Sequence, residues 1–217
     1  MKEKCWPANL FITYIMSGNV KSIITVQHTQ SVHHTNGMVG SWTDWELTEL
    51  GKKQAENIGR KLSAEIAGQN YKIYSSDLKR ARQTAEPIAR YMNAEIEFLE
   101  KLREINYGDA VGKSKQWMKE NSRPVNSFND RSFPGAESWR EFWIRVNELF
   151  NDIMADMTHN IVLVTHGGIC AVWLQIWLGA GIQEGKFGPA GSVSFMEMSV
   201  RGDRKVKLAN DLSYMQD

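Results

Sequence analysis

The chain has 217 residues, of which 42% are hydrophobic and 24% charged, and its formal net charge at pH 7 is +1. This length suffices for one α/β domain with a full core, and neither a repeat nor a Pro/Gly/Ser-rich linker divides it. No Lys/Arg cluster points to nucleic acid as a partner, and no apolar run reaches the roughly 18 residues of a membrane span.

Two features bear on compartment and on the N-terminus. Cys5 and Cys170 lie far apart, so we expect no disulfide framework and a cytoplasmic location. The apolar stretch 10–16 follows two lysines and faintly resembles a signal peptide, but it is short and lacks a small-x-small cleavage site. We therefore expect residues 1–21 to be an extension, with Met16 as an alternative start.

Strand and helix patterns alternate along most of the chain. Apolar β-branched runs predict strands, and apolar residues at helical spacing predict helices. In chain order the predicted elements are strand 22–27, a helix opening at 48 and ending before Gly68, strand 71–74, helix 78–91, strand 95–98, helix 137–157, strand 161–165, helix 169–178, and strands 192–199 and 204–208. This order predicts an α/β three-layer sandwich, in which helices cover both faces of a mainly parallel sheet.

Capping residues and apolar faces refine the first two helices. Thr48 is a plausible N-cap of the first helix, and Ser75 or Ser76 is expected to cap the second. The apolar face of the first helix is predicted to comprise Leu50, Ile58, Leu62 and Ile66.

Two histidines follow predicted core strands. His28 comes directly after strand 22–27, and His166 directly after strand 161–165. Ligands of open α/β sheets bind at the carboxyl ends of the strands, so both imidazoles are expected in one crevice. The pair is a candidate for catalysis, either as nucleophile or as acid and base.

The residues around His166 and on the second helix are suited to an anion. Glycines after His166 let the backbone approach a ligand, and the helix that starts there directs free N–H groups at the same point. A buried histidine bonded to a carbonyl is an equally good interpretation of His166 alone. Arg80 and Arg82 face different sides of their helix, so only one of them should reach the site.

Further candidates lie in loops. Glu104 could donate a proton to a leaving group, although an exposed glutamate is usually just solvated. His33 and His34, together with His28 and His166, also allow a metal site. That hypothesis is weaker, because adjacent side chains on an extended segment point to opposite sides and no cysteine or well-placed aspartate joins the histidines.

Several blocks of sequence, in the same order, are similar to those of a known family. The chain resembles the histidine phosphatase superfamily, the phosphoglycerate mutase-like proteins, over roughly residues 22–212, and we take 22–217 as the catalytic domain. The matching blocks are 26–31, 40–44, 47–51, 75–85, 102–105, 133–138 and 165–168.

The resemblance implies a mechanism and a set of site residues. His28 attacks phosphorus, Arg80 and His166 hold the equatorial oxygens, and Glu104 protonates the leaving group and then activates water. It implies neither a metal nor any other cofactor. The residues expected to bind phosphate are Gln27, Ser31, His34, Arg80 and Gly167.

The chain departs from the family signature Arg-His-Gly. Gln27 stands in place of the arginine and Thr29 in place of the glycine. Gln27 donates hydrogen bonds but carries no charge, and Thr29 adds a β-branched side chain where the backbone approaches the phosphate. His34 replaces a usual asparagine, and its protonation could restore positive charge and favour activity at acidic pH.

These observations favour a phosphatase that acts on a small phosphorylated metabolite. The stretch between Glu104 and His166 is too short for the insertion that covers a mutase site, although a mutase remains an alternative. A second alternative is a regulatory module that binds a phosphorylated ligand without turnover. Segments 35–45 and 108–133 are expected to contact the leaving group. Their aromatic residues hint at an apolar or ring-containing group, but packing within a buried cap explains these residues equally well. A homodimer is possible.

Overall fold

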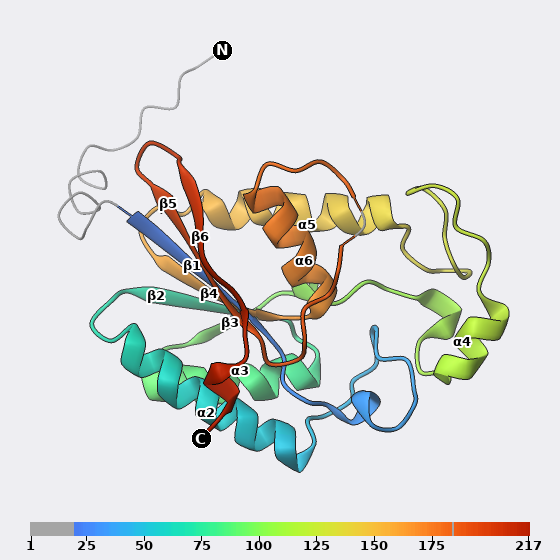
Figure 1. Cartoon of the computed structure of the whole chain (residues 1–217), viewed down its shortest axis with the longest axis horizontal. Coiled ribbons are helices and arrows are strands. Elements are labelled where there is room, and N and C mark those ends of the chain that lie inside the picture. The colour runs from blue at the N-terminus through green and yellow to red at the C-terminus, as the bar shows by residue number, and fades with distance from the viewer. Residues whose placement is uncertain (1–19, 184) are drawn as a thin grey trace.

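The computed structural model describes residues 20–183 and 185–217, so Cys5, Met16 and nearly all of the expected extension lie outside the described part. Figure 1 shows a central sheet with helices on both sides. The strands are β1 (Val20–Gln27), β2 (Tyr71–Ser75), β3 (Ile96–Phe98), β4 (Asn160–Thr165), β5 (Val193–Ser199) and β6 (Arg204–Asp211). The helices are α2 (Glu49–Glu65), α3 (Lys79–Met92), α4 (Lys115–Asn121), α5 (Trp139–Met154) and α6 (Gly167–Trp177), with single turns η1 (Val32–His34), η2 (Glu100–Leu102), η3 (Gly108–Ala110) and η4 (Ser213–Met215).

The six strands form one sheet in the order β3-β2-β4-β1-β5-β6. The four strands from β3 to β1 are parallel to one another, whereas β5 and β6 are antiparallel additions at one edge. The predicted α/β sandwich with a mainly parallel sheet is therefore confirmed. β1 and β4 are central neighbours, which brings the two strands that end in histidine side by side.

Side chains of β1 alternate between the two helical layers. Ile23 packs with α5 and α6, whereas Ile24 and Val26 pack with α2 and α3 on the other face. All three side chains are fully buried. Because both faces of the central strands are covered, these strands are mostly apolar, although Thr25 in the middle of β1 is a buried polar residue.

Three local predictions are corrected. Leu50 was expected on the buried face of α2 but is 52% exposed, because that face begins with Gly51 and Ala55 and Leu50 lies to one side of it. Neither Ser75 nor Ser76 occupies the N-cap of α3; that position is Leu78. The fifth helix begins at Trp139 rather than residue 137, because Ser138 caps it by accepting a hydrogen bond from the backbone of Glu141.

Other boundaries shift by a few residues. β1 begins two residues before the predicted 22–27, α6 begins at Gly167 rather than 169, and β6 continues to Asp211. Thr48 is the N-cap of α2, as predicted. Within residues 20–183 and 185–217, no helix is both long and apolar enough to cross a membrane.

Candidate active site

The ends of β1 and β4 place the two histidines together. The His28 amide donates to the Thr165 carbonyl at 2.8 Å, which continues the parallel ladder by one residue. The imidazole centroids of His28 and His166 are 5.1 Å apart, at an interplanar angle of 65°. Both side chains are almost completely buried. The predicted crevice with two imidazoles is thus present at the carboxyl edge of the sheet.

A cavity of about 310 Å³ opens above these histidines. It is lined by Gln27, His28, His33, His34, Gly40, Arg80, Glu104, Tyr107, Lys115, Gly167 and Phe187, among others. Every predicted site residue except Ser31 and His166 therefore lines one cavity, and those two bond to or pack against its lining.

The hydrogen bonds of His28 determine which nitrogen is available for attack. Its Nδ1 lies 2.9 Å from the Thr29 carbonyl oxygen, which can only accept, so the neutral ring carries its proton on Nδ1. Nε2 then keeps its lone pair, and Arg80 Nε donates to it at 3.2 Å. Burial and the positive charge of Arg80 hold the pKa of His28 well below its usual range. His28 is therefore a neutral imidazole whose Nε2 faces Arg80.

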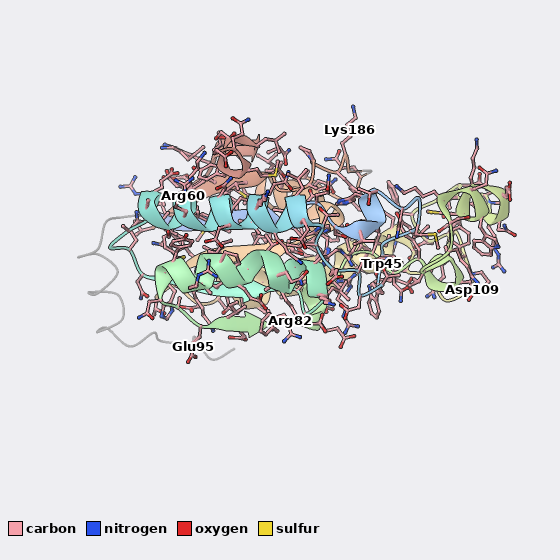
Figure 2. The ribbon with its side chains drawn as sticks, turned by 90° about the horizontal axis from the view of Figure 1, so that it is seen from below. Trp45, Arg60, Arg82, Glu95, Asp109 and Lys186 are labelled. Atoms are coloured by element: carbon pink, nitrogen blue, oxygen red, sulfur yellow. The ribbon has the colours of Figure 1, made fainter. Side chains whose placement is uncertain are left out.

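Arg80 is the arginine that reaches the site. Its guanidinium is 1% exposed and donates to the carbonyl oxygens of Ser41 and Thr43, both at 2.7 Å. Burial lowers the pKa of Arg80 to about 10, so it stays charged at neutral pH. Arg82 points outward from α3 over the ring of Phe98, as predicted for one of the two (Figure 2).

His166 is held by a serine from the neighbouring strand. Its Nε2 lies 2.8 Å from Ser76 Oγ, and that oxygen already accepts from the Leu78 amide. When the serine hydroxyl donates to Nε2, the proton of the neutral imidazole lies on Nδ1. Nδ1 is buried without a partner in the described part of the chain. Ser76 thus positions His166 instead of capping α3.

Glu104 sits beneath the start of α6. Its two carboxylate oxygens accept from the amides of Gly168 at 3.0 Å and Ile105 at 2.9 Å. One amide at the start of α6 is thus used by Glu104, while Gly167 lines the cavity. Burial raises the pKa of Glu104 despite these two bonds, and burial next to Glu104 raises the pKa of Tyr107 to about 12. A raised pKa suits a carboxylic acid that donates a proton.

The turn η1 brings His33 and His34 together. The extended backbone expected here is wrong, because a 3₁₀ turn places the two ring centroids 4.0 Å apart. Ser31 contacts both rings: its amide donates to His34 Nδ1 at 3.1 Å, and its hydroxyl lies 2.6 Å from His33 Nδ1. Because His34 Nδ1 accepts the hydrogen bond from the Ser31 amide, the proton of the neutral His34 ring lies on Nε2.

Protonation of these two rings requires strongly acidic conditions. Burial and neighbouring positive charges lower the pKa of His33 to about 3 and that of His34 to about 4. Arg80 and Lys115 are the nearby cations. In the ligand-free protein, the pKa of His34 therefore leaves this ring neutral at neutral pH, and the protonation that was expected to favour activity at acidic pH occurs only near pH 4.

The substitutions in the signature have different consequences. Thr29 is buried and absent from the cavity lining, because its hydroxyl donates to the Gly51 carbonyl at 2.8 Å and its amide to Thr84 Oγ1 at 3.2 Å. Its methyl-bearing side chain is thus accommodated outside the cavity. Gln27 does line the cavity, next to Gly167, and its Oε1 is buried without a partner among the described residues.

His28, His33 and His34 lie close enough together to bind one metal ion. One ring nitrogen each from His28, His33 and His34 lies within 4.8 Å of the others. Coordination through Nε2 would require His34 to move its proton to Nδ1 and lose the bond from Ser31, and would place a dication beside Arg80. The donor set therefore fits a metal less well than it fits an anion.

Some site residues were not singled out from the sequence. The carbonyls of Ser41 and Thr43 hold Arg80, Ser76 holds His166, and Lys115 lies at the cavity. For the loop that contains Ser41 and Thr43, the one sequence feature that pointed to the site was the family-like block 40–44. The position of Lys115 depends on the pairing of residues 113–115 with residues 37–39 of the loop after β1, which no local pattern specifies.

Comparisons with known proteins agree with this geometry. The family model of the histidine phosphatase superfamily, branch 1, matches residues 23–211. The chain belongs to this superfamily. It is similar to the putative phosphoserine phosphatase 2 of Hydrogenobacter thermophilus, with 30% identity over 172 residues that cover 76% of this chain and 82% of the relative.

Two further relatives of this histidine phosphatase differ in the activity that their names state. The metal-independent phosphoserine phosphatase of Arabidopsis thaliana is 29% identical over 74% of this chain and 71% of its own length. The phosphoglycerate mutase of Bacillus anthracis superposes with a TM-score of 0.76 at 24% identity, over 93% of this chain and 97% of that structure. The structure comparison supports the fold, whereas the relatives named phosphatases support phosphoric monoester hydrolysis.

Proposed function

We propose that the protein hydrolyses phosphate monoesters through a phosphohistidine on His28. The observation that carries this proposal is the neutral His28 ring, whose Nε2 keeps its lone pair and lies 3.2 Å from Arg80 Nε. A nucleophile needs that lone pair, and the adjacent guanidinium is placed to attract a phosphoryl group to it.

The reaction proceeds in two displacements. In the first, His28 Nε2 forms a bond to phosphorus as the ester P–O bond breaks, and Glu104 gives its proton to the departing oxygen. In the second, Glu104 takes a proton from water, the hydroxyl bonds to phosphorus, and the P–N bond breaks. Phosphate and the alcohol are released, and His28 and Glu104 regain their starting states.

We infer that neutral N–H groups do part of the work of the missing arginine. His34 presents Nε2–H because the Ser31 amide occupies its Nδ1. When the Ser31 hydroxyl donates to Nδ1 of His33, that ring also presents Nε2–H to the cavity. With His166 Nδ1–H and Arg80, these groups form a set of donors around the phosphoryl oxygens.

The substrate class and setting follow as proposals. The partner is a small phosphorylated metabolite, no metal or cofactor is required, and the protein acts in the cytoplasm without nucleic acid. A homodimer is one assembly compatible with this function. We favour hydrolysis over phosphotransfer because the stretch between Glu104 and His166 offers only residues 106–138, before α5, as an insertion over the site. A ligand-binding protein without turnover remains the second candidate, and the missing arginine at Gln27 is the observation that favours it.

Hydrolysis of 4-nitrophenyl phosphate between pH 5 and 8 tests the proposal. We expect turnover in the wild type and in a His159→Ala control, and none in His28→Ala. Rapid quenching in alkali should trap a phosphoprotein that acid hydrolyses, as expected for phosphohistidine. Turnover that survives in His28→Ala would refute the mechanism. Phosphate binding without turnover in the wild type would favour the second candidate.

A further inference from the structure

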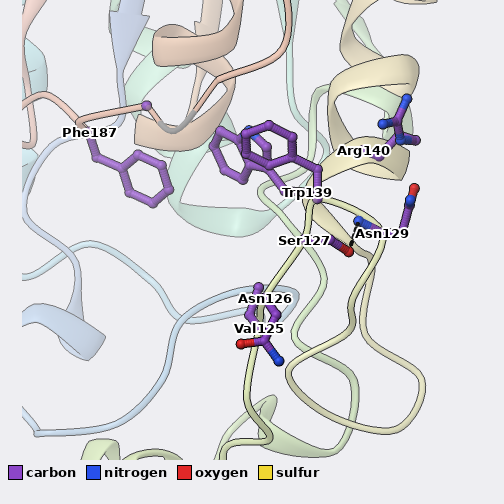
Figure 3. A pocket seen from close by; sticks show the side chains of 9 residues that line it. Val125, Asn126, Ser127, Asn129, Trp139, Arg140 and Phe187 are labelled. Atoms are coloured by element: carbon purple, nitrogen blue, oxygen red, sulfur yellow. Dashed lines mark hydrogen bonds between the residues drawn. The ribbon is translucent and has the colours of Figure 1, made fainter.

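A second, larger cavity adjoins the site. Its volume is about 600 Å³, and its walls come from the segment before α5, from the first residues of α5, and from the chain that follows α6. Figure 3 shows Phe187 and Trp139 along one wall, Val125 and Asn126 on a loop opposite them, and Arg140 at the far end. The phosphoryl chemistry proposed above uses none of these residues.

Phe187 connects the two cavities. It is the residue that lines both of them, and it is 46% exposed. Its Cβ lies 3.1 Å from the point where a β-carbon on Gly167 would be, so the phenyl group stands beside the start of α6. A molecule that extends from the phosphate site past Phe187 therefore enters the larger cavity.

Glu104 gives this extension a direction. Its carboxylate accepts from the Gly168 amide, and the Phe142 ring reaches within 3.1 Å of the β-carbon position of Gly168. The ring of Phe142 in turn lies 5.4 Å from that of Trp139. Glu104, the proposed proton donor to the leaving alcohol, is thus connected to Trp139 through Gly168 and the buried ring of Phe142.

The walls of the cavity are suited to a ring. The rings of Trp139 and Phe187 are nearly parallel, at 21°, with centroids 6.4 Å apart. Trp139 is fixed by a hydrogen bond from its indole nitrogen to the Gln183 carbonyl at 2.8 Å. Opposite these aromatic faces, the side chains of Asn126 and Arg140 offer polar groups. An apolar wall with a few polar groups is the usual composition of a ligand site.

We propose that this cavity is the subsite for the leaving group, and that the preferred substrates are phosphate monoesters whose alcohol carries a ring with polar substituents. This inference rests on the proposed phosphatase function and specifies its substrate class. The ring packs on Trp139 and Phe187 while its phosphate reaches His28. Sugar rings and aromatic rings share the required flat apolar face, and the experiment separates them.

Three primary alkyl phosphates test the subsite at matched chemical reactivity: glycerol 3-phosphate, glucose 6-phosphate and benzyl phosphate. We expect kcat/KM for at least one ring-bearing ester to exceed that for glycerol 3-phosphate by about 10-fold. Trp139→Leu should abolish this preference, and Trp139→Phe should retain most of it. Trp117→Leu is the matched control, because Trp117 packs on Phe133 and lines neither cavity.

Equal kcat/KM for all three esters, or an equal loss on all three in Trp139→Leu, would overturn the inference while leaving the phosphatase intact. Binding to His28→Ala, measured by calorimetry, separates the two proposals. If no ester is turned over but ring-bearing esters bind about 10-fold more tightly than glycerol 3-phosphate, the subsite stands and the phosphatase falls. If they bind no more tightly, the subsite falls as well.

Discussion

Ser31→Ala is the most informative single substitution, because Ser31 supports two site histidines through different atoms. Alanine removes the hydroxyl that lies 2.6 Å from His33 Nδ1 and keeps the backbone amide that donates to His34 Nδ1 at 3.1 Å. Only His33 should then be free to place its proton on Nδ1. In that form Nε2 presents a lone pair to the phosphoryl oxygen in place of a donor.

The expected loss follows from one hydrogen bond to a charged group. Such bonds contribute about 1.5–3 kcal/mol, which corresponds to roughly a 10- to 150-fold change at 1.36 kcal/mol per factor of ten. We therefore expect kcat/KM to fall about 10- to 100-fold, and the inhibition constant of inorganic phosphate to rise similarly. Nitrogen NMR of the ring should detect the shift of the His33 proton from Nε2 to Nδ1.

A double-mutant cycle distinguishes positioning from a general loss of stability. If Ser31 acts through His33, then Ser31→Ala combined with His33→Ala should be no worse than His33→Ala alone. Ser63→Ala serves as the control, because Ser63 is a half-buried serine of α2 whose hydroxyl donates to the Arg60 carbonyl. Additive losses, an unchanged kcat/KM in Ser31→Ala, or a loss that tracks a lowered melting temperature would refute the reasoning.

Three further predictions concern charge in the site. Glu104→Gln should lower steady-state turnover about 10²- to 10⁴-fold and give a burst of one nitrophenol per site with 4-nitrophenyl phosphate. The burst is expected because nitrophenolate departs without a proton, whereas hydrolysis of the phosphohistidine still needs Glu104 as a base. The absence of a burst at full substrate occupancy would contradict this prediction. Burial raises the pKa of Glu104, so the free energy of unfolding falls as pH rises from the pKa of the unfolded carboxyl to that of the folded one. The loss is complete above the folded pKa, and Glu104→Gln should therefore melt higher than wild type at a pH at which the folded carboxyl is ionised. His28 and His166 stay neutral in the fold, whereas the same rings in the unfolded chain are protonated below about pH 6.5. Each ring should therefore lower the free energy of unfolding by up to about 1.4 kcal/mol for each pH unit below that value. Urea titrations of a variant with both histidines changed to Asn should show a weaker dependence of this free energy on pH, and an equal dependence would count against the prediction. Gln27→Arg should raise kcat/KM by about 10- to 10³-fold by adding a cation beside the phosphoryl group, and no gain in a folded variant would argue that the site needs no second cation.

The sequence by itself determined the order of elements and the edge of the sheet at which chemistry occurs. Apolar runs that end in His28 and His166 specify buried parallel strands, and the carboxyl ends of such strands meet at one edge whatever the loops do. The motif around Arg80 likewise indicated one buried arginine, because residues two apart on a helix face different sides. These conclusions depend on periodicity, which is local.

Tertiary structure decided how the side chains of the site point and what they contact. The 3₁₀ turn that brings His33 and His34 together depends on contacts of the loop, and an extended interpretation of the same residues gave the wrong answer. The Thr29 side chain stays out of the cavity only because it is held elsewhere by hydrogen bonds to Gly51 in α2 and Thr84 in α3.

The larger cavity is likewise a product of packing. Trp139 begins one helix and Phe187 follows another, and they form one wall of the cavity only because α5 and α6 lie on the same face of the sheet. Spacing along the chain sets which face of an element a residue occupies. The partners across a cavity are set by long-range packing, which single-sequence patterns do not encode.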